Sequence, residues 1–337
     1  MDTLTHTVIG ACLGEAIAGK QLGKKAMLIG ALANNFPDID VISGLWVSEA
    51  KALLVHRGIT HSILFNIILS FLLAWIFKKA FKKEDLHFSK WLLLIGSGLF
   101  VHIFIDAFTS YGTGWFEPFD DYRVSFNTIF ILDPVFTLPV LIAAIVLLIL
   151  KNDSVKRKPW YRFGLLASSF YLVLITINKI YVDGVVRKNM TQQNINYVNY
   201  MSTPTPLNNF LWYVVLCSDK EYKIGYYSIF DKNKNIEFEN VQRNDSLLTF
   251  PCDPEQVADL QRFSRGYYCA KIENDTIVFS DMRFGQIGGW YKKDAPFVYN
   301  FKLAQNCSNK TALQKGRFAS FNNGAMNKLF KRMCGEE

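Results

Sequence analysis

Histidines and acidic residues gather in the first third of the chain, within or beside long apolar segments. They occur in four strings: Asp2-x3-His6, Pro37-Asp38-Ile39-Asp40, His56-x4-His61 and His102-x3-Asp106. Imidazole nitrogens and carboxylate oxygens are ligands of zinc and related divalent ions. Ionisable side chains inside apolar segments are costly and usually mark function. The pattern therefore predicts a divalent-metal site, suited to one to three ions, in a membrane domain.

Two pairs of these residues have informative spacing. His102 and Asp106 are four residues apart in a predicted helix, so they share one face and can bind one ion. The alternative for them is a hydrogen-bonded pair inside the membrane. Thr60 is a candidate N-cap for a helix that runs to Phe77, which places His61 in its first turn and His56 in the preceding loop. The alternative is that both are interfacial polar residues.

Other candidates lie before and beside these pairs. Asp38 and Asp40 alternate on a segment that we expect to be extended, so one can bind metal while the other orients a histidine. An Asx turn is the alternative. His6 begins the first helix, and Glu15 lies further along that helix and could reach the same site.

Arg57 stands next to His56 and is a candidate for binding an anionic oxygen such as that of a phosphate. The alternative is a contact with a lipid headgroup or an acidic side chain. With Asp40, Arg57 forms the pair of residues to which we assign catalytic roles.

The composition changes near residue 182. Apolar runs dominate the part before it, at roughly 7–18, 26–36, 59–77, 91–109, 129–150 and 160–181. About 20 residues are needed to span a bilayer. The last four runs qualify or nearly do, and the first two predict half-length helices inside the bundle. Pro37 is expected to end the second of them.

Basic residues lie in short loops between the apolar runs, at 20–25, 78–90 and 151–158, and account for much of the formal net charge of +8. Short basic loops are typical of the cytoplasmic side, so we interpret them as topology signals rather than a nucleic-acid patch. With these loops inside, every candidate ligand falls at the outer end of its helix. The C-terminal domain then lies outside as well. The expected location is a membrane that the chain crosses several times; the family resemblance given below implies the bacterial inner membrane.

Residues 183–337 resemble a soluble domain. A polar connector is expected at 187–199, followed by strands at 211–217, 222–230, 266–272, 276–280 and 297–302 and by helices at 255–263 and 324–333. These elements predict a small, mostly antiparallel α+β domain. The whole chain is therefore expected to be mostly α, with a multi-span helical bundle in residues 1–182. Five cysteines lie in the tail, enough for two disulfides outside the cell or for buried free thiols.

The four motifs together carry a family resemblance over residues 1–182. They are Met1-Asp2-Thr3-Leu4-Thr5-His6, Pro37-Asp38-Ile39-Asp40, His56-Arg57-Gly58-Ile59-Thr60-His61-Ser62 and His102-x3-Asp106-x2-Thr109-x2-Gly112. In them the chain resembles the bacterial membrane-bound metal-dependent hydrolases, also described as LexA-binding and inner-membrane-associated, and especially those with an extra C-terminal domain. Phe36 stands where that family usually has leucine.

The family is grouped by similarity with zinc-dependent phospholipase C and P1-type nucleases. The resemblance therefore implies zinc, phosphoester hydrolysis and the metal ligands His6, Asp38, His56, His61, His102 and Asp106. We expect a phosphoester or phospholipid-like substrate, reached from the lipid bilayer, and no nucleic acid. The alternative is a non-enzymatic membrane scaffold with a structural metal and a tail domain that binds a protein partner. A transporter is disfavoured because the ligands cluster at one membrane face.

Overall fold

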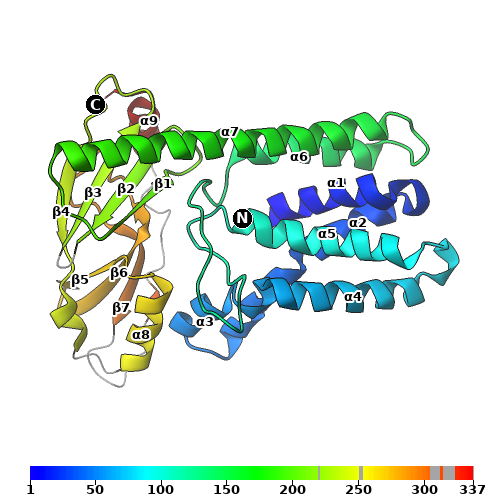
Figure 1. The fold of residues 1–337 in the computed structure, drawn as a ribbon, viewed down its shortest axis with the longest axis horizontal. Helices are drawn as coiled ribbons and strands as arrows, with labels where there is room; N and C mark the ends of the chain where they lie inside the picture. The colour runs from blue at the N-terminus through cyan, green and yellow to red at the C-terminus, as the bar shows by residue number, and fades with distance from the viewer. Residues whose placement is uncertain (219–220, 250–252, 304–311, 314–322, 337) are drawn as a thin grey trace. The chain divides into compact units, whose positions relative to one another are not determined.

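The computed structural model describes residues 1–218, 221–249, 253–303, 312–313 and 323–336 (Figure 1). The chain forms two compact units. The first comprises Met1–Ser43 and Val55–Thr176, and the second comprises Gly44–Leu54 and Ile177–Glu337. The predicted boundary at residue 182 lies within a helix that contributes to both units.

The first unit is helical. Its helices are α1 (Thr3–Leu22), α2 (Lys24–Asn35), α4 (Ile63–Ala80), α5 (Phe88–Asp106), α6 (Pro134–Ile149) and the first part of α7 (Arg157–Gln192), with the 3₁₀ helices η1 (Phe36–Leu45), η2 (Ile59–His61) and η3 (Lys82–Glu84). Its described part has two apolar clusters, one around α1, α6 and α7 and the other around α2, α4 and α5. Side-chain packing in these clusters holds α1 and α5, which carry the polar residues described below.

Helices α1 and α2 approach each other closely because both carry glycine at the crossing. A Cβ atom on Gly30 would lie 2.2 Å from the carbonyl oxygen of Gly10, and one on Gly14 would lie 2.0 Å from that of Ala26. Small residues allow such close backbone contact in membrane helices. α2 ends before Pro37, as predicted. The prediction of a half-length helix holds for α2, which has 12 residues, but is wrong for α1, which has 20.

Among the residues that the structure describes, three helices are long and apolar enough to cross a membrane: α4, α5 and α7. The fourth expected span, 129–150, yields only the 16-residue α6, so that prediction is wrong in length. The Asp133 side chain caps this helix and Pro134 opens it, which keeps the residues before them out of the helix.

α7 is longer than the predicted apolar run, since it has 36 residues and extends to Gln192. The prediction of a polar connector from residue 187 is therefore wrong for 187–192. Val182, Val185 and Val186 explain the extension, because these apolar side chains are buried against strands of the second unit.

The second unit contains two four-stranded antiparallel sheets, which confirms the prediction for the tail. One sheet has the order β1-β2-β3-β4 and the other β5-β6-β7-β8. The strands are β1 (Asn199–Pro204), β2 (Leu211–Cys217), β3 (Glu221–Ser228), β4 (Phe238–Gln242), β5 (Tyr268–Glu273), β6 (Thr276–Gln286), β7 (Phe297–Leu303) and β8 (Ala312–Leu313). The described part of the tail also contains α8 (Pro254–Phe263), α9 (Asn323–Met333) and the 3₁₀ helix η4 (Asp245–Thr249).

A segment from the N-terminal half also belongs to the second unit. Residues Gly44–Leu54 include most of α3 (Glu49–Val55), and Ala50 is fully buried in an apolar cluster with Leu260 and Phe279. This segment lies between two of the candidate metal-binding strings in the sequence. The second unit is therefore built from a segment that lies between two of these strings and from the C-terminal part of the chain.

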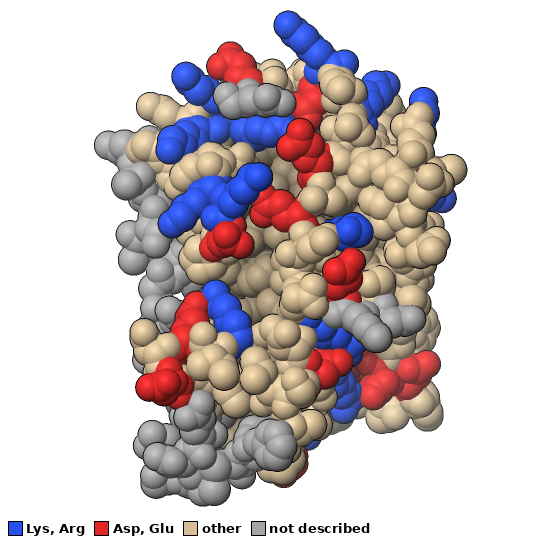
Figure 2. Space-filling view, turned by 90° about the vertical axis from the view of Figure 1, so that its left-hand side faces the viewer, with Lys and Arg blue, Asp and Glu red and all other residues tan. Residues whose placement is uncertain are grey.

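Two further features of the molecule are the charged side chains on its surface and the state of its cysteines. Figure 2 shows lysine, arginine, aspartate and glutamate side chains intermixed over one face, which is typical of a solvated protein surface. Cys12, Cys269 and Cys334 are free thiols. Cys252 and Cys307 lie outside the described residues.

Candidate metal centre

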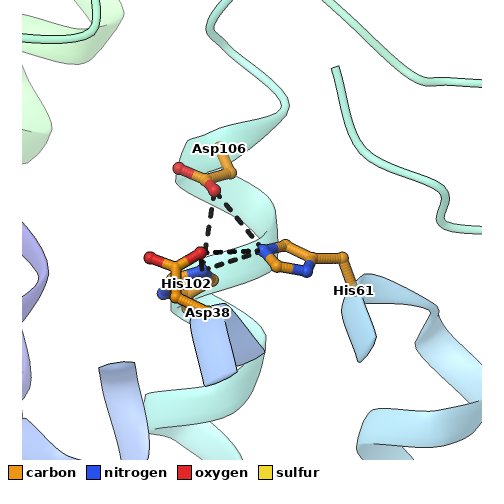
Figure 3. A group of neighbouring side chains, drawn as sticks. All are labelled: Asp38, His61, His102 and Asp106. Carbon is orange, nitrogen blue, oxygen red and sulfur yellow. Dashed lines mark hydrogen bonds and ion pairs between the residues drawn. The ribbon is translucent and has the colours of Figure 1, made fainter. Parts of the chain in front are cut away.

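Four side chains from three elements of the first unit converge on one point (Figure 3). Asp38 comes from η1 and His61 from η2, while His102 and Asp106 both come from α5. The two α5 residues are one helical turn apart, so the prediction that they share a face is confirmed, with His102 Nε2 and Asp106 Oδ2 3.5 Å apart. These four residues form a possible metal-binding group, which we call the four-ligand group.

The distances within this group match those around a tetrahedral ion. The two Nε2 atoms of His61 and His102 are 3.1 Å apart. Asp38 Oδ1 lies 3.4 Å from each of them, and Asp106 Oδ2 lies 3.6 Å from His61 Nε2. Four ligands about 2.0–2.2 Å from a tetrahedral zinc ion lie about 3.3–3.6 Å from one another. The spacing therefore fits a small divalent cation without rearrangement.

The hydrogen bonding of His102 fixes which ring nitrogen can bind metal. Its Nδ1 lies 2.5 Å from the backbone carbonyl oxygen of Asn34. A carbonyl oxygen only accepts hydrogen bonds, so Nδ1 must carry the proton. In the neutral ring, Nε2 then presents a lone pair toward the four-ligand group. Histidines that bind metal through one ring nitrogen commonly donate the N–H of the other to a backbone carbonyl in this way.

His61 reaches the same state through a relay. The Thr60 hydroxyl donates to Asp40 Oδ2 at 2.5 Å, so its oxygen is free to accept from His61 Nδ1–H at 3.0 Å. The neutral His61 ring then also presents its Nε2 lone pair to the group. In these neutral tautomers two lone pairs face each other 3.1 Å apart, and their repulsion is removed either by a proton on one Nε2 or by a cation between them.

The carboxylate oxygens in the group point to the same conclusion. Among the described residues, Asp38 Oδ1 and Asp106 Oδ2 are buried oxygens that accept no hydrogen bond. Buried charges are stable only when they are paired or bind metals. Asp106 is already paired, through Oδ2 with the Arg57 guanidinium and through Oδ1 with the N-terminal amino group, so this argument rests on Asp38. The four-ligand group therefore combines four acceptors at one point, which is the chemistry of a cation site.

The pKa values near the group agree with this view. Burial lowers the pKa of His61, but hydrogen bonds to the neighbouring carboxylates, that of Asp106 foremost, raise it by more, to about 9. Burial raises the pKa of Asp40, but hydrogen bonds from His56 and His61 outweigh it and hold that pKa well below its usual range. The site therefore favours a positive charge, which a proton or a metal ion can supply.

A second possible metal-binding group shares Asp38 with the first. It consists of Asp38, Asp40 and His56, with one ligand atom from each within 4.8 Å of the others. The side chains of Asp38 and His56 retain 22% and 24% of their exposure, so this group reaches the surface, whereas His61, His102 and Asp106 are fully buried. Asp40 accepts hydrogen bonds from His56 Nδ1 and the Arg57 backbone N–H at 2.8 and 2.9 Å.

Arg57 is buried and contacts an acidic side chain, which was one of the two alternatives for it. Its Nε lies 3.0 Å from Asp106 Oδ2, and its Nη1 donates to Thr109 Oγ1 at 2.8 Å. The guanidinium also lies over the ring of Tyr111. Its backbone has φ of 62°, a strained value for a residue with a side chain, and such strain tends to cluster at functional sites.

His6 lies behind the four-ligand group rather than in it. Its Nε2 is 3.1 Å from Asp106 Oδ1, and its ring stacks on His102 with centroids 3.9 Å apart. Glu15 does not reach the site. It forms a buried ion pair with Arg157, with Arg157 Nη2 and Glu15 Oε2 2.6 Å apart, so the expectation for Glu15 was wrong.

Two local predictions are also wrong. Residues 36–45 form a 3₁₀ helix and not an extended segment. The helix N-cap is Ser62, whose side chain accepts from the Phe65 N–H, and not Thr60. The Thr60 hydroxyl is taken by Asp40, so it cannot cap α4, and His61 lies in η2 before the helix begins.

Comparison with known proteins assigns the first part of the chain to a family. The family model described as YdjM inner membrane protein matches residues 1–182, more than half of the chain. The chain belongs to the YdjM inner membrane protein family. The matched residues include the whole four-ligand group.

Two curated relatives support the assignment. The YdjM-family chain is 34% identical over 142 residues to the uncharacterized protein YfhP of Bacillus subtilis strain 168, a match that covers 40% of this chain and 42% of YfhP. It is 29% identical over 122 residues to the inner membrane protein YbcI of Escherichia coli strain K12, covering 36% of this chain and 69% of YbcI. No solved structure matches the chain.

The loop after α5 of this YdjM-family protein contributes contacts that the sequence left open. Tyr111 lies against His56 with ring centroids 5.3 Å apart, and Arg123 Nη1 donates to the His56 carbonyl oxygen at 3.1 Å. The Gly114 N–H donates to the Arg57 carbonyl oxygen at 2.8 Å. The loop therefore holds the segment that carries His56 and Arg57. The aromatic and turn residues of the loop were the only signal of this role.

Proposed function

We propose that this chain is a membrane-embedded hydrolase that uses divalent metal to cleave a phosphoester, such as one in a phospholipid headgroup. One observation carries the proposal: four lone-pair donors converge at tetrahedral spacing, and Asp38 joins them to a second group that reaches the surface. The resemblance of the four motifs to metal-dependent hydrolases supports the same chemistry.

The residues for holding metal are divided between the two groups. Asp38, His61, His102 and Asp106 would hold a buried ion, and Asp38, Asp40 and His56 a second one nearer the surface. Zinc is the metal that their nitrogens and carboxylate oxygens suit best. Such an ion, when bound, polarises a phosphoryl oxygen and lowers the pKa of water to about 7.

Two polar residues hold these ligands in place, and one of them, Asp40, also belongs to the second group. Asp40 orients His56 directly and His61 through Thr60, and Arg57 neutralises Asp106. We therefore propose that Asp40 and Arg57 are positioning residues. The partly exposed side of Asp38 and His56 is where a substrate phosphate would approach.

Orientation follows from charge. The short loops with an excess of lysine would face the cytoplasm, which puts the ends of α1 and α5 that carry His6 and Asp106 on the outer side. On this proposal the chain crosses the membrane several times and acts on groups at the outer leaflet.

The proposal is tested with purified protein in detergent, wild type beside His61→Ala and His102→Ala. Metal content by elemental mass spectrometry and hydrolysis of bis(p-nitrophenyl) phosphate and a short-chain phospholipid are measured on each. Both variants should lose metal and turnover together while remaining folded. His87→Ala is the matched control, because it removes an exposed histidine that lies outside the four-ligand group. His87 is the N-cap of α5, and its ring accepts a hydrogen bond from the Ser89 N–H. Full turnover in both ligand variants would overturn the proposal.

A non-enzymatic scaffold is the second candidate, and one observation favours it. The four-ligand group fills all four positions of a tetrahedron with protein atoms, as structural zinc sites do, whereas catalytic sites keep one position for water. On this reading the tail domain binds a protein partner. Chelation would then lower the melting temperature, and no phosphoester would be hydrolysed by the fully metal-loaded protein.

A further inference from the structure

A second polar site lies in the first unit at the opposite ends of its helices from the metal centre. A cavity of about 550 Å³ opens there between α1, the start of α5, the loop 152–155 and the start of α7. Lys90 on α5 lines it, and His102 lies twelve residues further along the same helix. At 1.5 Å per residue the two sites are about 18 Å apart. The cavity is therefore a separate site.

The floor of the cavity is a saturated ion pair. Arg157 donates from Nε and Nη2 to the two carboxylate oxygens of Glu15 at 2.7 and 2.6 Å, and from Nη1 to the carbonyl oxygens of Leu147 and Leu150. Both side chains are almost completely buried. The pair has no net charge, and its groups are already hydrogen-bonded to each other and to backbone carbonyls. It therefore shapes the cavity but is not expected to bind a ligand itself.

The rim carries positive charge that the described chain does not neutralise. Lys20, Lys90 and Lys158 line the cavity, and none of their side-chain ammonium groups forms an ion pair or hydrogen bond within the residues that the structure describes. The only other charged side chain at the rim is Asp153, which is exposed. Three cations against one anion leave the rim basic.

Apolar side chains stand beside the lysines. Ile17 and Tyr161 are half-buried in the wall, and Val155 in the loop is 88% exposed. A ligand with an anionic head and an apolar body fits this pattern, and the volume is within the range of about 300–1,000 Å³ typical of small-molecule sites. Basic pockets between membrane helices recognise phosphate headgroups in this way.

We propose that this cavity binds a phosphate group, carried by an anionic phospholipid headgroup or by a soluble phosphomonoester. Lys20, Lys90 and Lys158 surround the phosphate, and the Glu15–Arg157 pair closes the site beneath it. The site does not depend on the metal centre and stands whether or not the chain is a hydrolase.

Binding is measured by calorimetry on the full chain in a non-ionic detergent. The probes are short-chain phosphatidylglycerol, short-chain phosphatidylcholine, glycerol 3-phosphate and inorganic phosphate. The triple variant Lys20→Gln, Lys90→Gln, Lys158→Gln should bind phosphatidylglycerol about a hundredfold more weakly, since each lysine contributes roughly fivefold. Saturable phosphatidylglycerol binding with weak phosphatidylcholine binding identifies a lipid headgroup. Equal or tighter binding of glycerol 3-phosphate identifies a soluble phosphomonoester.

Two further variants separate a built site from general attraction. Lys78→Gln, Lys82→Gln, Lys83→Gln removes the same charge from another basic loop and should leave binding unchanged. Ala16→Trp adds no charge but fills the cavity from an exposed position on α1 and should weaken binding about tenfold. The proposal is overturned if no probe binds, or if the two triple variants behave alike while Ala16→Trp has no effect.

Discussion

Asp40 shows how a carboxylate can matter to a metal centre without occupying the buried ligand position. It accepts hydrogen bonds from the Thr60 hydroxyl and the Arg57 backbone N–H on Oδ2, and from His56 on Oδ1. Its charge and position therefore determine the rotamer of His56 and, through Thr60, the tautomer of His61. Partners of this kind often change metal affinity 10–100-fold when removed.

The Thr60 relay gives a prediction that separates orientation from ligation. Thr60→Val removes the hydroxyl that accepts from His61 Nδ1–H and donates to Asp40, while keeping the side-chain shape. We expect metal affinity to fall about 10–100-fold with the protein still folded. Competition with a chelating dye measures the affinity. Thr60→Ser restores the hydroxyl and should restore affinity; equal loss in both variants would show that the relay does not orient His61.

At this scale the sequence predicted the polar cluster better than the roles within it. Acids and imidazoles in apolar segments must find partners, so their types indicated a metal site. The ligand set that the family resemblance implied also contained His6 and His56, which the four-ligand group does not include. Which of Asp38 and Asp40 faces the cluster depends on the 3₁₀ geometry of residues 36–45, which has no periodic signal in so short a segment. The backbone carbonyl of Asn34 is invisible to residue-type reasoning altogether.

At the scale of elements, the positions of these residues depend on the close backbone contact between α1 and α2. α1 carries His6, and α2 ends with the Asn34 carbonyl that fixes His102, so their crossing sets the distance between two sides of the site. The crossing depends on glycine: a Cβ on Gly30 would lie 2.2 Å from the carbonyl oxygen of Gly10 and 2.9 Å from Gly14 Cα.

Gly30→Ala should therefore push the two helices apart. Overpacking of this kind costs about 1–3 kcal/mol of stability. We expect a lower melting temperature in detergent and weaker metal binding, measured on the same samples. Gly44→Ala is the matched control, because its Cβ would meet only Ala52 Cβ at 3.9 Å. A Gly30→Ala protein as stable and as metal-loaded as Gly44→Ala would show that the helices can separate without affecting the site.

Prediction of the helices and strands from the sequence succeeded for some elements and failed for others. Strands with dense apolar residues, such as β2 and β6, were found, whereas the edge strands β1 and β4 were missed because their polar sequences show little alternation. The extension of α7 to Gln192 was missed because its last turns are amphipathic and are held by packing on a sheet that lies later in the sequence.

At the scale of the whole molecule, the chain passes between its two units three times. Residues 44–54 leave the first unit after Asp40, contribute Ala50 to an apolar cluster of the second unit, and return just before His56. Asp40 and His56 are hydrogen-bonded to each other at 2.8 Å. The segment that closes this contact is therefore anchored in the tail domain, an arrangement that the local sequence pattern of 44–54 does not reveal.

This path predicts that loosening the anchor in the tail weakens metal binding in the membrane domain. Ala50→Glu places a carboxylate in the cluster with Leu260 and Phe279, where burying it is costly, so the anchor should detach. We expect metal affinity to fall about tenfold, because the Asp40–His56 contact is then formed in only a fraction of molecules. Lys51→Glu changes the charge on an exposed neighbour and should leave affinity unchanged. Circular dichroism of both variants reports whether the sheets persist. If Ala50→Glu keeps its sheets and full metal affinity, the anchor does not support the site, and if both variants lose affinity, local charge and not anchoring is the cause.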